Sequence, residues 1–150
     1  MDGGGEIGGF TGKAGGALTD IYASATMILA ENNQGCIAGK FNAGATLTTS
    51  YASCTSIASL ALTGAVCGQD AGTTFTDVFY YNNGAVPAQG DPGIAALASK
   101  TAMENQGNYT NFDFTNNWKK PSANPLSPYN PAVLSPVLAW QCGKQGIVCP

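Results

Sequence analysis

Three segments of this 150-residue chain resemble one another and recur at nearly constant spacing. Each joins a short turn that ends in glycine to a threonine-rich segment with one large apolar residue and, four residues later, an aromatic residue. The turn glycines are Gly12, Gly39 and Gly68, which lie 27 and 29 residues apart. A period between 20 and 50 residues is typical of proteins in which similar units stack in a row. The chain is therefore expected to form a repeat structure.

Each repeat has the sequence pattern of β-strands joined by tight turns. In residues 46–48, for example, one large apolar residue lies between two hydroxylated ones, which is the two-residue period of a strand with one buried face. Glycine-rich stretches between such segments indicate turns. Glycine suits a positive φ or a close backbone approach, and we expect one of these at Gly12, Gly39 and Gly68. The repeats predict an all-β fold.

If each repeat forms one coil, its large apolar residues stack in three columns with those of its neighbours. The columns are Phe10, Ile37 and Val66; Leu18, Leu47 and Phe75; and Tyr22, Tyr51 and Phe79. Stacked coils bury such columns against one another, as in solenoid proteins. We predict a β-solenoid of about three coils, at residues 7–34, 35–64 and 65–83, after a flexible segment at 1–6. The alternative is a glycine-rich β-sandwich with evenly spaced strands.

Residues 84–150 lack the repeat and are expected to form an irregular cap over the last coil, because a stack of strands needs an atypical terminal unit. A short helix is predicted from four apolar residues on one helical face: Ile94, Leu97, Ala98 and Met103. Three aromatic residues would lie over the last coil: Phe112, Phe114 and Trp118. Five prolines between 121 and 136 predict an extended loop, and residues 137–140 predict a returning strand.

The segments GGFTGKAGGALTDIYAS and IAGKFNAGATLTTSYAS resemble the GLUG repeat, which occurs in bacterial surface adhesins and other large exported proteins. Phe10, Ile37 and Val66 replace the leucine of its Gly-Leu-x-Gly core. The later segments GIAALASKTAMENQGNYTNFDFTNNW and YNPAVLSPVLAWQ are similar to the terminal part of such arrays. The resemblance covers roughly residues 7–141. It implies a right-handed parallel β-helix on a cell surface, with an adhesive role and no shared catalytic site.

The first coil lacks a comparable cap, since only six residues precede Ile7. Three coils at about 4.8 Å per rung make a stack about 15 Å tall, with an exposed first rung. Two outcomes are expected: the chain is the C-terminal piece of a longer solenoid, or the open end docks head to tail on a neighbouring subunit. A head-to-tail contact that does not close produces a filament.

Five cysteines favour an oxidising, extracellular location. We expect Cys142 and Cys149 to close a small terminal disulfide loop. The Cα atoms of Cys36 and Cys67 should lie roughly 8 Å apart, which is too far for a disulfide. Either cysteine could pair with Cys54 if the coil corners bring them together, and buried thiols are an equal alternative. The odd count leaves one thiol that could link subunits.

Composition excludes several functions. Charged residues make up only 10% of the chain, which has neither histidine nor arginine and carries a net charge of -3. Nucleic-acid binding needs a basic face, and membrane insertion needs an apolar run of about 20 residues, so neither is expected. No metal site or cofactor is predicted, because zinc sites use histidine or closely paired cysteines. The tripeptide at 108–110 makes Asn108 a possible glycosylation site.

Three functions are compatible with such a solenoid. A β-helix carbohydrate-active enzyme needs paired carboxylates, but Thr49 separates Asp20 from Asp77 at the equivalent corner position, so catalysis is not expected. The Thr-x-Thr segments at 46–48 and 74–76 suggest an ice-binding face. We favour a non-enzymatic extracellular surface protein, adhesin-like or structural. Its partner would be another copy of the chain, or a surface protein or glycan.

Overall fold

The computed structural model describes residues 5–26, 33–55, 63–81, 94–127 and 133–150. In this part of the chain most of the regular structure is β-strand, and the one α-helix is short. The three repeats contain the strands β1 Ile7–Gly8, β2 Thr11–Ala14, β3 Ala17–Thr19, β4 Tyr22–Ala23, β5 Gln34–Gly35, β6 Ala38–Phe41, β7 Thr46–Ala52, β8 Thr63–Gly64, β9 Cys67–Asp70 and β10 Thr74–Tyr81. The prediction of an all-β chain with one short helix is confirmed for the described residues.

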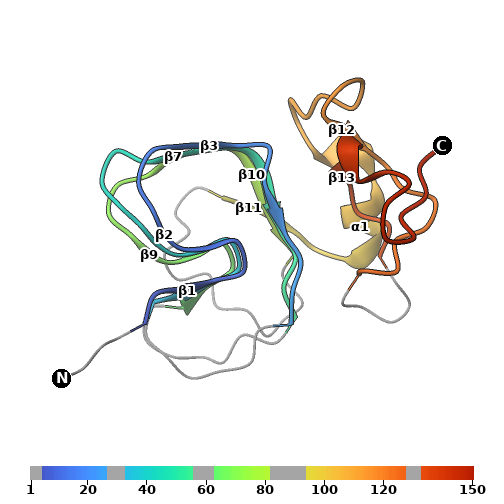
Figure 1. The fold of residues 1–150 in the computed structure, drawn as a ribbon. Helices are drawn as coiled ribbons and strands as arrows, with labels where there is room; N and C mark the ends of the chain where they lie inside the picture. Colours follow the sequence, from blue (N-terminus) through green and yellow to red (C-terminus); the bar gives the residue numbers. More distant parts are fainter. Residues whose placement is uncertain (1–4, 27–32, 56–62, 82–93, 128–132) are drawn as a thin grey trace.

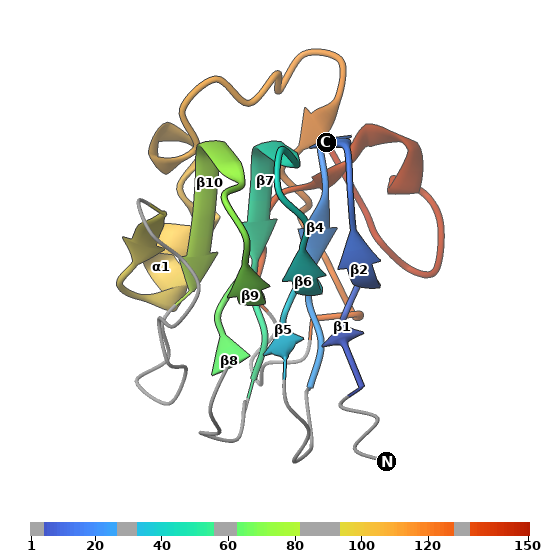
Figure 2. The same ribbon diagram turned by 90° about the vertical axis from the view of Figure 1, so that its left-hand side faces the viewer.

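Equivalent strands of the three repeats pair in parallel. They form three sheets with the strand orders β1-β5-β8, β2-β6-β9 and β3-β7-β10, and β4 also pairs with β7. Viewed along the stack, the three repeats follow nearly the same path (Figure 1), and the side view shows successive strands next to one another (Figure 2). Each repeat therefore finds its backbone hydrogen-bond partners in the repeats beside it.

The first two predicted columns are aligned in the structure. Leu18 and Phe75 are both register partners of Leu47, which is fully buried. In the other column, the Phe10 N–H donates to the Ile37 carbonyl, and the Ile37 N–H donates to the Val66 carbonyl at 2.9 Å. Ile37 and Val66 are fully buried, whereas Phe10, in the first repeat, is 55% exposed. The inner core is thus built from equivalent positions of the three repeats.

The third column is also aligned, but it faces the opposite way from the prediction. Tyr22 and Phe79 are register partners of Tyr51, and all three belong to a second core shared with the C-terminal region. The cause is a corner residue with left-handed backbone two positions before each aromatic residue. Asp20, Thr49 and Asp77 occupy this corner, with φ of 53°, 43° and 53°.

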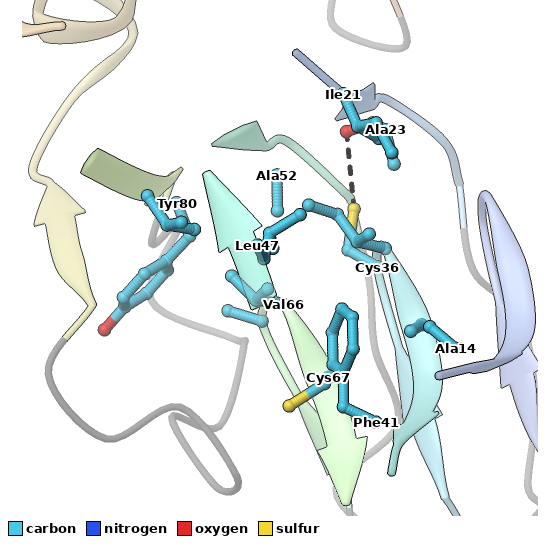
Figure 3. Close-up of a cluster of buried hydrophobic side chains, with 14 of the residues drawn as sticks. Ala14, Ile21, Ala23, Cys36, Phe41, Leu47, Ala52, Val66, Cys67 and Tyr80 are labelled. Atoms are coloured by element: carbon cyan, nitrogen blue, oxygen red, sulfur yellow. Dashed lines mark hydrogen bonds between the residues drawn. The ribbon is translucent and has the colours of Figure 1, made fainter. Parts of the chain in front are cut away.

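The corner residue acts as one extra residue in the strand, and a shift of one residue moves the following side chains to the other face. Leu47 and Ser50 are therefore buried on the inner side, while Tyr51 points outward. The inner positions after the corner are taken instead by Ile21, Val78, Ala23, Ala52 and Tyr80. Figure 3 shows several of these side chains around Leu47 and Val66.

Two of the three turn glycines lie where backbones approach closely. A Cβ on Gly12 would lie 2.5 Å from the Glu6 carbonyl oxygen, and a Cβ on Gly39 would lie 2.5 Å from the Asn33 carbonyl oxygen. Gly68 lies within β9 and is buried. The positive φ angles fall on a different set of repeated glycines, namely Gly16, Gly44 and Gly72. Gly12 and Gly39 are therefore required by close approach of backbone segments.

The C-terminal region contains β11 Ala95–Leu97, α1 Lys100–Glu104, the 3-10 turns η1 Gln106–Asn108 and η2 Ala139–Gln141, and the strands β12 Trp118–Lys119 and β13 Val137–Leu138. The helix predicted from Ile94 to Met103 is wrong in its first half, because Ala95–Leu97 pairs in parallel with β10. The edge of β10 needs backbone partners, and this requirement outweighs a weak helical spacing. The helix begins only after Ser99, whose hydroxyl accepts a hydrogen bond from the Ala102 N–H.

The prediction that the C-terminal aromatic residues lie over the last coil is also wrong. The C-terminal region packs against the side of the stack (Figures 1 and 2), and Trp118 contacts both Tyr22 of the first repeat and Tyr51 of the second. The strand predicted at 137–140 is confined to Val137–Leu138, which pairs antiparallel with Trp118–Lys119. The outward aromatic column therefore provides a lateral docking face for this region.

Two disulfides cross-link the chain. Cys142 pairs with Cys149, as predicted, and Cys36 pairs with Cys54 with their Cα atoms 5.8 Å apart. The remaining cysteine, Cys67, is a fully buried thiol in the inner core. The Cys36 sulfur lies 3.4 Å from the Ala23 carbonyl oxygen of the first repeat (Figure 3), so this disulfide is part of the contact between repeats.

Replacing Leu47 with alanine tests the inner core. Leu47 is the centre of an aligned column and fully buried, so L47A should lower the free energy of unfolding by about 3 kcal/mol, as for other buried leucines. The matched control is L126A, since Leu126 is 49% exposed and should lose less than about 0.5 kcal/mol. Guanidinium unfolding under oxidising conditions measures both. Equal losses in the two variants would contradict the inner core.

Candidate functional site

A second core joins the outward aromatic column to the C-terminal region. The rings of Tyr22 and Tyr51 are stacked, with centroids 5.3 Å apart and planes at 9°. Trp118 packs on both, and its ring centroid lies 4.7 Å from that of Phe112. Phe79 completes the cluster through edge contacts with Tyr109 and Phe112. Aromatic contacts of this kind add about 0.5–1.5 kcal/mol each beyond burial, so the C-terminal region is firmly held.

One buried hydroxyl group holds the C-terminal region on this face, and a second orders the region internally. The Tyr51 hydroxyl donates to the Pro136 carbonyl, and the Tyr51 hydroxyl oxygen also lies 3.2 Å from Ser135 Oγ. The Tyr109 hydroxyl donates to the Met103 carbonyl at 2.7 Å, and burial raises the pKa of Tyr109 far above its usual range. Tyr109 is therefore a neutral donor at any physiological pH.

Asp20 attaches the C-terminal region to the first repeat. Its Oδ1 accepts hydrogen bonds from the Trp118 indole Nε1 at 3.0 Å and from the Thr49 hydroxyl at 2.6 Å. Its Oδ2 accepts a hydrogen bond from Asn117 Nδ2 at 2.8 Å. Asp77, at the equivalent corner of the third repeat, accepts one from Asn111 Nδ2 at 2.8 Å. The corner carboxylates are thus attachment points for the C-terminal region.

A cleft lies beside Asp20, between the first repeat and the C-terminal region, and we call it the junction cleft. It consists of two hollows of about 370 and 340 Å³ that share Asp20, Leu138 and Trp140 in their linings. The rest of the lining comes from the first repeat (Gly9, Phe10 and residues 21–24) and from the C-terminal region (Asn116, Asn117, Ala139 and Gln141). The cleft is the strongest candidate for a binding site in the described part of the chain.

Two exposed aromatic side chains line the junction cleft. Trp140 is 64% exposed and Phe10 is 55% exposed, which is unusual for large aromatic side chains in a folded domain. The Lys144 ammonium nitrogen lies 5.0 Å from the centroid of the Trp140 ring, within the range of a cation–π contact. This contact helps to hold the ring without burying it.

Polar groups at the cleft are held in place by hydrogen bonds. Asn116 Nδ2 donates to Asp113 Oδ2 at 2.8 Å, and Asp113 Oδ1 accepts from the N–H groups of Thr115 and Asn116. The pKa of Asp113 is lowered, chiefly by the hydrogen bond from the Asn116 side chain. The ionised carboxylate therefore orders this loop. Burial raises the pKa of Tyr22 on the opposite side, although a hydrogen bond with the Gln141 side chain partly opposes the increase.

The remaining predicted site residues lie away from the junction cleft. Asn108 is partly buried in η1, and its Nδ2, which would carry a glycan, donates to the Ala102 carbonyl at 2.8 Å. The Thr-x-Thr segments are in register: Thr48 is flanked by Thr19 and Thr76, and Thr46 by Ala17 and Thr74. Within the described residues, no cluster of three or more histidine, cysteine, aspartate or glutamate side chains could hold a metal ion.

Sequence reasoning did not identify the junction cleft. Asp20 attracted attention only as half of a possible acidic pair, and Trp140 was assigned to a strand that ends at Leu138. The NNW segment at 116–118 supplies two of the three donors to Asp20. The sequence shows the corner aspartate and the amide-rich segment at 116–118 separately. Nothing in the repeat period indicates that they pair.

Comparison with known proteins does not assign the chain to a family. It shows no significant match to a family model, to a curated protein or to a solved structure. Among the described residues, no helix is long and apolar enough to cross a membrane.

Replacing Asp20 with asparagine tests the attachment of the C-terminal region. Asparagine tolerates left-handed backbone, so D20N removes the charge from three hydrogen bonds without straining the corner. Hydrogen bonds to charged groups are stronger than neutral ones, and we expect a loss of about 2 kcal/mol in the free energy of unfolding. D77N is the matched control, because Asp77 has the same φ and one such bond. Denaturant unfolding followed by fluorescence measures both variants, and a loss in D20N no larger than in D77N would contradict the assigned role.

Proposed function

We propose that this chain is a non-enzymatic, extracellular, adhesin-like binding module built on a right-handed parallel β-solenoid. The observation that carries the proposal is the junction cleft, where the exposed Trp140 and the oriented carboxylate Asp20 line the same hollow. A concave site that combines aromatic surface with a few fixed polar groups is typical of ligand binding.

The parallel pairing of equivalent strands supports the solenoid. Three repeats contribute to three sheets in the same order, and Ile37, Leu47 and Val66 at equivalent apolar positions are buried in the inner core. Parallel crossover connections are almost always right-handed, which agrees with the hand implied by the GLUG resemblance. We also propose that the chain belongs to that repeat family.

The cysteines support an extracellular location. Four of the five form two disulfides, which persist in oxidising environments. The first closes a loop of 18 residues, for which loop-closure entropy predicts a stabilisation of about 3 kcal/mol. A small domain with three repeats would benefit strongly from such a cross-link.

A binding role is favoured over a head-to-tail filament by the arrangement of β11. This strand pairs with the segment Phe79–Tyr81 of β10, so part of the third-repeat edge is already occupied. A second copy stacked on that edge would have to displace β11 or pair with it. The preferred partner is therefore a surface protein or glycan rather than another copy of the chain.

Adhesion to surfaces tests this proposal. Beads coated with the oxidised protein should bind saturably to cell-surface or extracellular-matrix preparations, and beads coated with reduced, denatured protein should not. Light scattering on the same sample should show a monomer at all concentrations tested. Beads that bind no surface, or a concentration-dependent filament, would overturn the adhesive role in favour of an inert or structural one.

The threonine ladder favours ice binding as a second candidate. Five threonines and Ala17 form two in-register rows over three repeats, and Thr19, Thr74 and Thr76 are exposed. If this face binds ice, the protein should show thermal hysteresis that T48Y and T76Y remove. The control S122Y, at an exposed position outside the ladder, should keep the hysteresis. A parent chain without thermal hysteresis, or T48Y and T76Y variants that keep it, would exclude this function.

A further inference from the structure

We propose that the junction cleft is a binding site for a neutral glycan, with Trp140 as the stacking platform and Asp20 as the hydroxyl acceptor. The inference rests on the proposed binding function and names its ligand class and contact residues. Pyranose sugars combine an apolar face of C–H groups with a rim of hydroxyl groups. The cleft offers a matching pair of surfaces.

The aromatic surface is available without rearrangement. Trp140 is 64% exposed and lines both hollows of the cleft. Lys144 lies 5.0 Å from the centroid of its ring, so a ligand would stack on the part of the ring that Lys144 leaves open. Phe10 adds a second exposed ring on the side of the first repeat. Flat apolar groups stack on such rings with useful energy, as in other ligand complexes that use aromatic platforms.

The polar groups retain acceptor capacity toward the cleft. Asp20 accepts three hydrogen bonds, whereas a carboxylate has about four acceptor sites, so Oδ2 can accept one more. Asn116 and Asn117 each donate through Nδ2 to a carboxylate, and neither side-chain oxygen accepts a bond from the described residues. Sugar hydroxyl groups are donors that would satisfy these oxygens.

The arrangement is rigid before any ligand binds. Asp20 is held by the buried Trp118, and Asn116 is held by Asp113. The Gln141 side-chain oxygen accepts a hydrogen bond from the Leu138 N–H at 2.9 Å, and this bond fixes the turn that carries Trp140. Groups that are already ordered lose little entropy on binding, which favours affinity in a small site.

The charges at the cleft favour a neutral ligand. The carboxylate that lines it is Asp20, and the other polar lining side chains are Ser24, the Tyr22 phenol and the amides of Asn116, Asn117 and Gln141. Lys144 lies over Trp140 and not among the residues that line the two hollows. A sialylated or sulfated sugar would bring its negative charge close to Asp20, where like charges repel. We therefore assign the site to hexose or N-acetylhexosamine oligosaccharides without acidic groups.

An array of neutral, sialylated and sulfated oligosaccharides tests the ligand class. Neutral oligosaccharides should be bound, and the best one is then titrated while tryptophan fluorescence is quenched with acrylamide. The chain has two tryptophans, of which Trp118 is fully buried and Trp140 is exposed. The ligand should protect the quenchable emission of Trp140, and this emission should be missing in W140F.

Variants separate the cleft from the rest of the surface. W140A should weaken binding at least tenfold and W140F should retain part of the affinity, while V148A, at a position 52% exposed and outside the lining, should bind like the parent chain. Thermal melting checks that all three variants fold. Binding only to acidic glycans, or W140A binding as tightly as V148A, would overturn the inference.

The bead assay distinguishes failure of the glycan site from failure of the proposed adhesive function. Beads that adhere to surfaces while no neutral oligosaccharide binds would overturn the glycan site and leave the adhesive role intact. Beads that fail to adhere would overturn the adhesive role itself. Adhesion that neutral oligosaccharides block and W140A weakens would support both.

Discussion

One backbone constraint governs the architecture: the left-handed corner residue that each repeat carries between its inner apolar residue and its outer aromatic residue. Asp20, Thr49 and Asp77 adopt this conformation at equivalent positions. It adds one residue to the inward–outward alternation of the strand. After the corner, the residues that would have faced inward therefore face outward, and those that would have faced outward face inward. Aspartate is among the residues that tolerate it, and threonine occupies it only in the middle repeat.

The corner divides the apolar residues of each repeat between two cores. The inner core stabilises the stack through aligned columns and contains the disulfide between Cys36 and Cys54. The second core lies on the other face of the strands, where Tyr22, Tyr51 and Phe79 contact the C-terminal region. Because this region docks on all three repeats, it braces them laterally, and the cleft arises where it meets the first repeat. The same corner carboxylate both fastens the region and lines the site.

Much of the repeat region was predictable because periodicity records which residues occupy equivalent positions. Leu18, Leu47 and Phe75 are spaced by the repeat, and the structure aligns them. Periodicity does not record which face of the strand a residue takes. The prediction that Tyr51 contributes to the same core as Leu47 was therefore wrong. The C-terminal region has no repeat to guide it. The weak helical spacing around Leu97 was misread, because the need of β10 for a backbone partner appears only in three dimensions.

The sequence alone determined the repeat period, the all-β character and the terminal disulfide loop, because each depends on local spacing or residue type. Tertiary structure decided the partner of Cys36, the outward turn of the aromatic column and the position of Trp140 beside Asp20. These features join segments up to about 120 residues apart. Their geometry depends on how strands twist, turn at the corner and pack, and a linear pattern carries no information about distances across the fold.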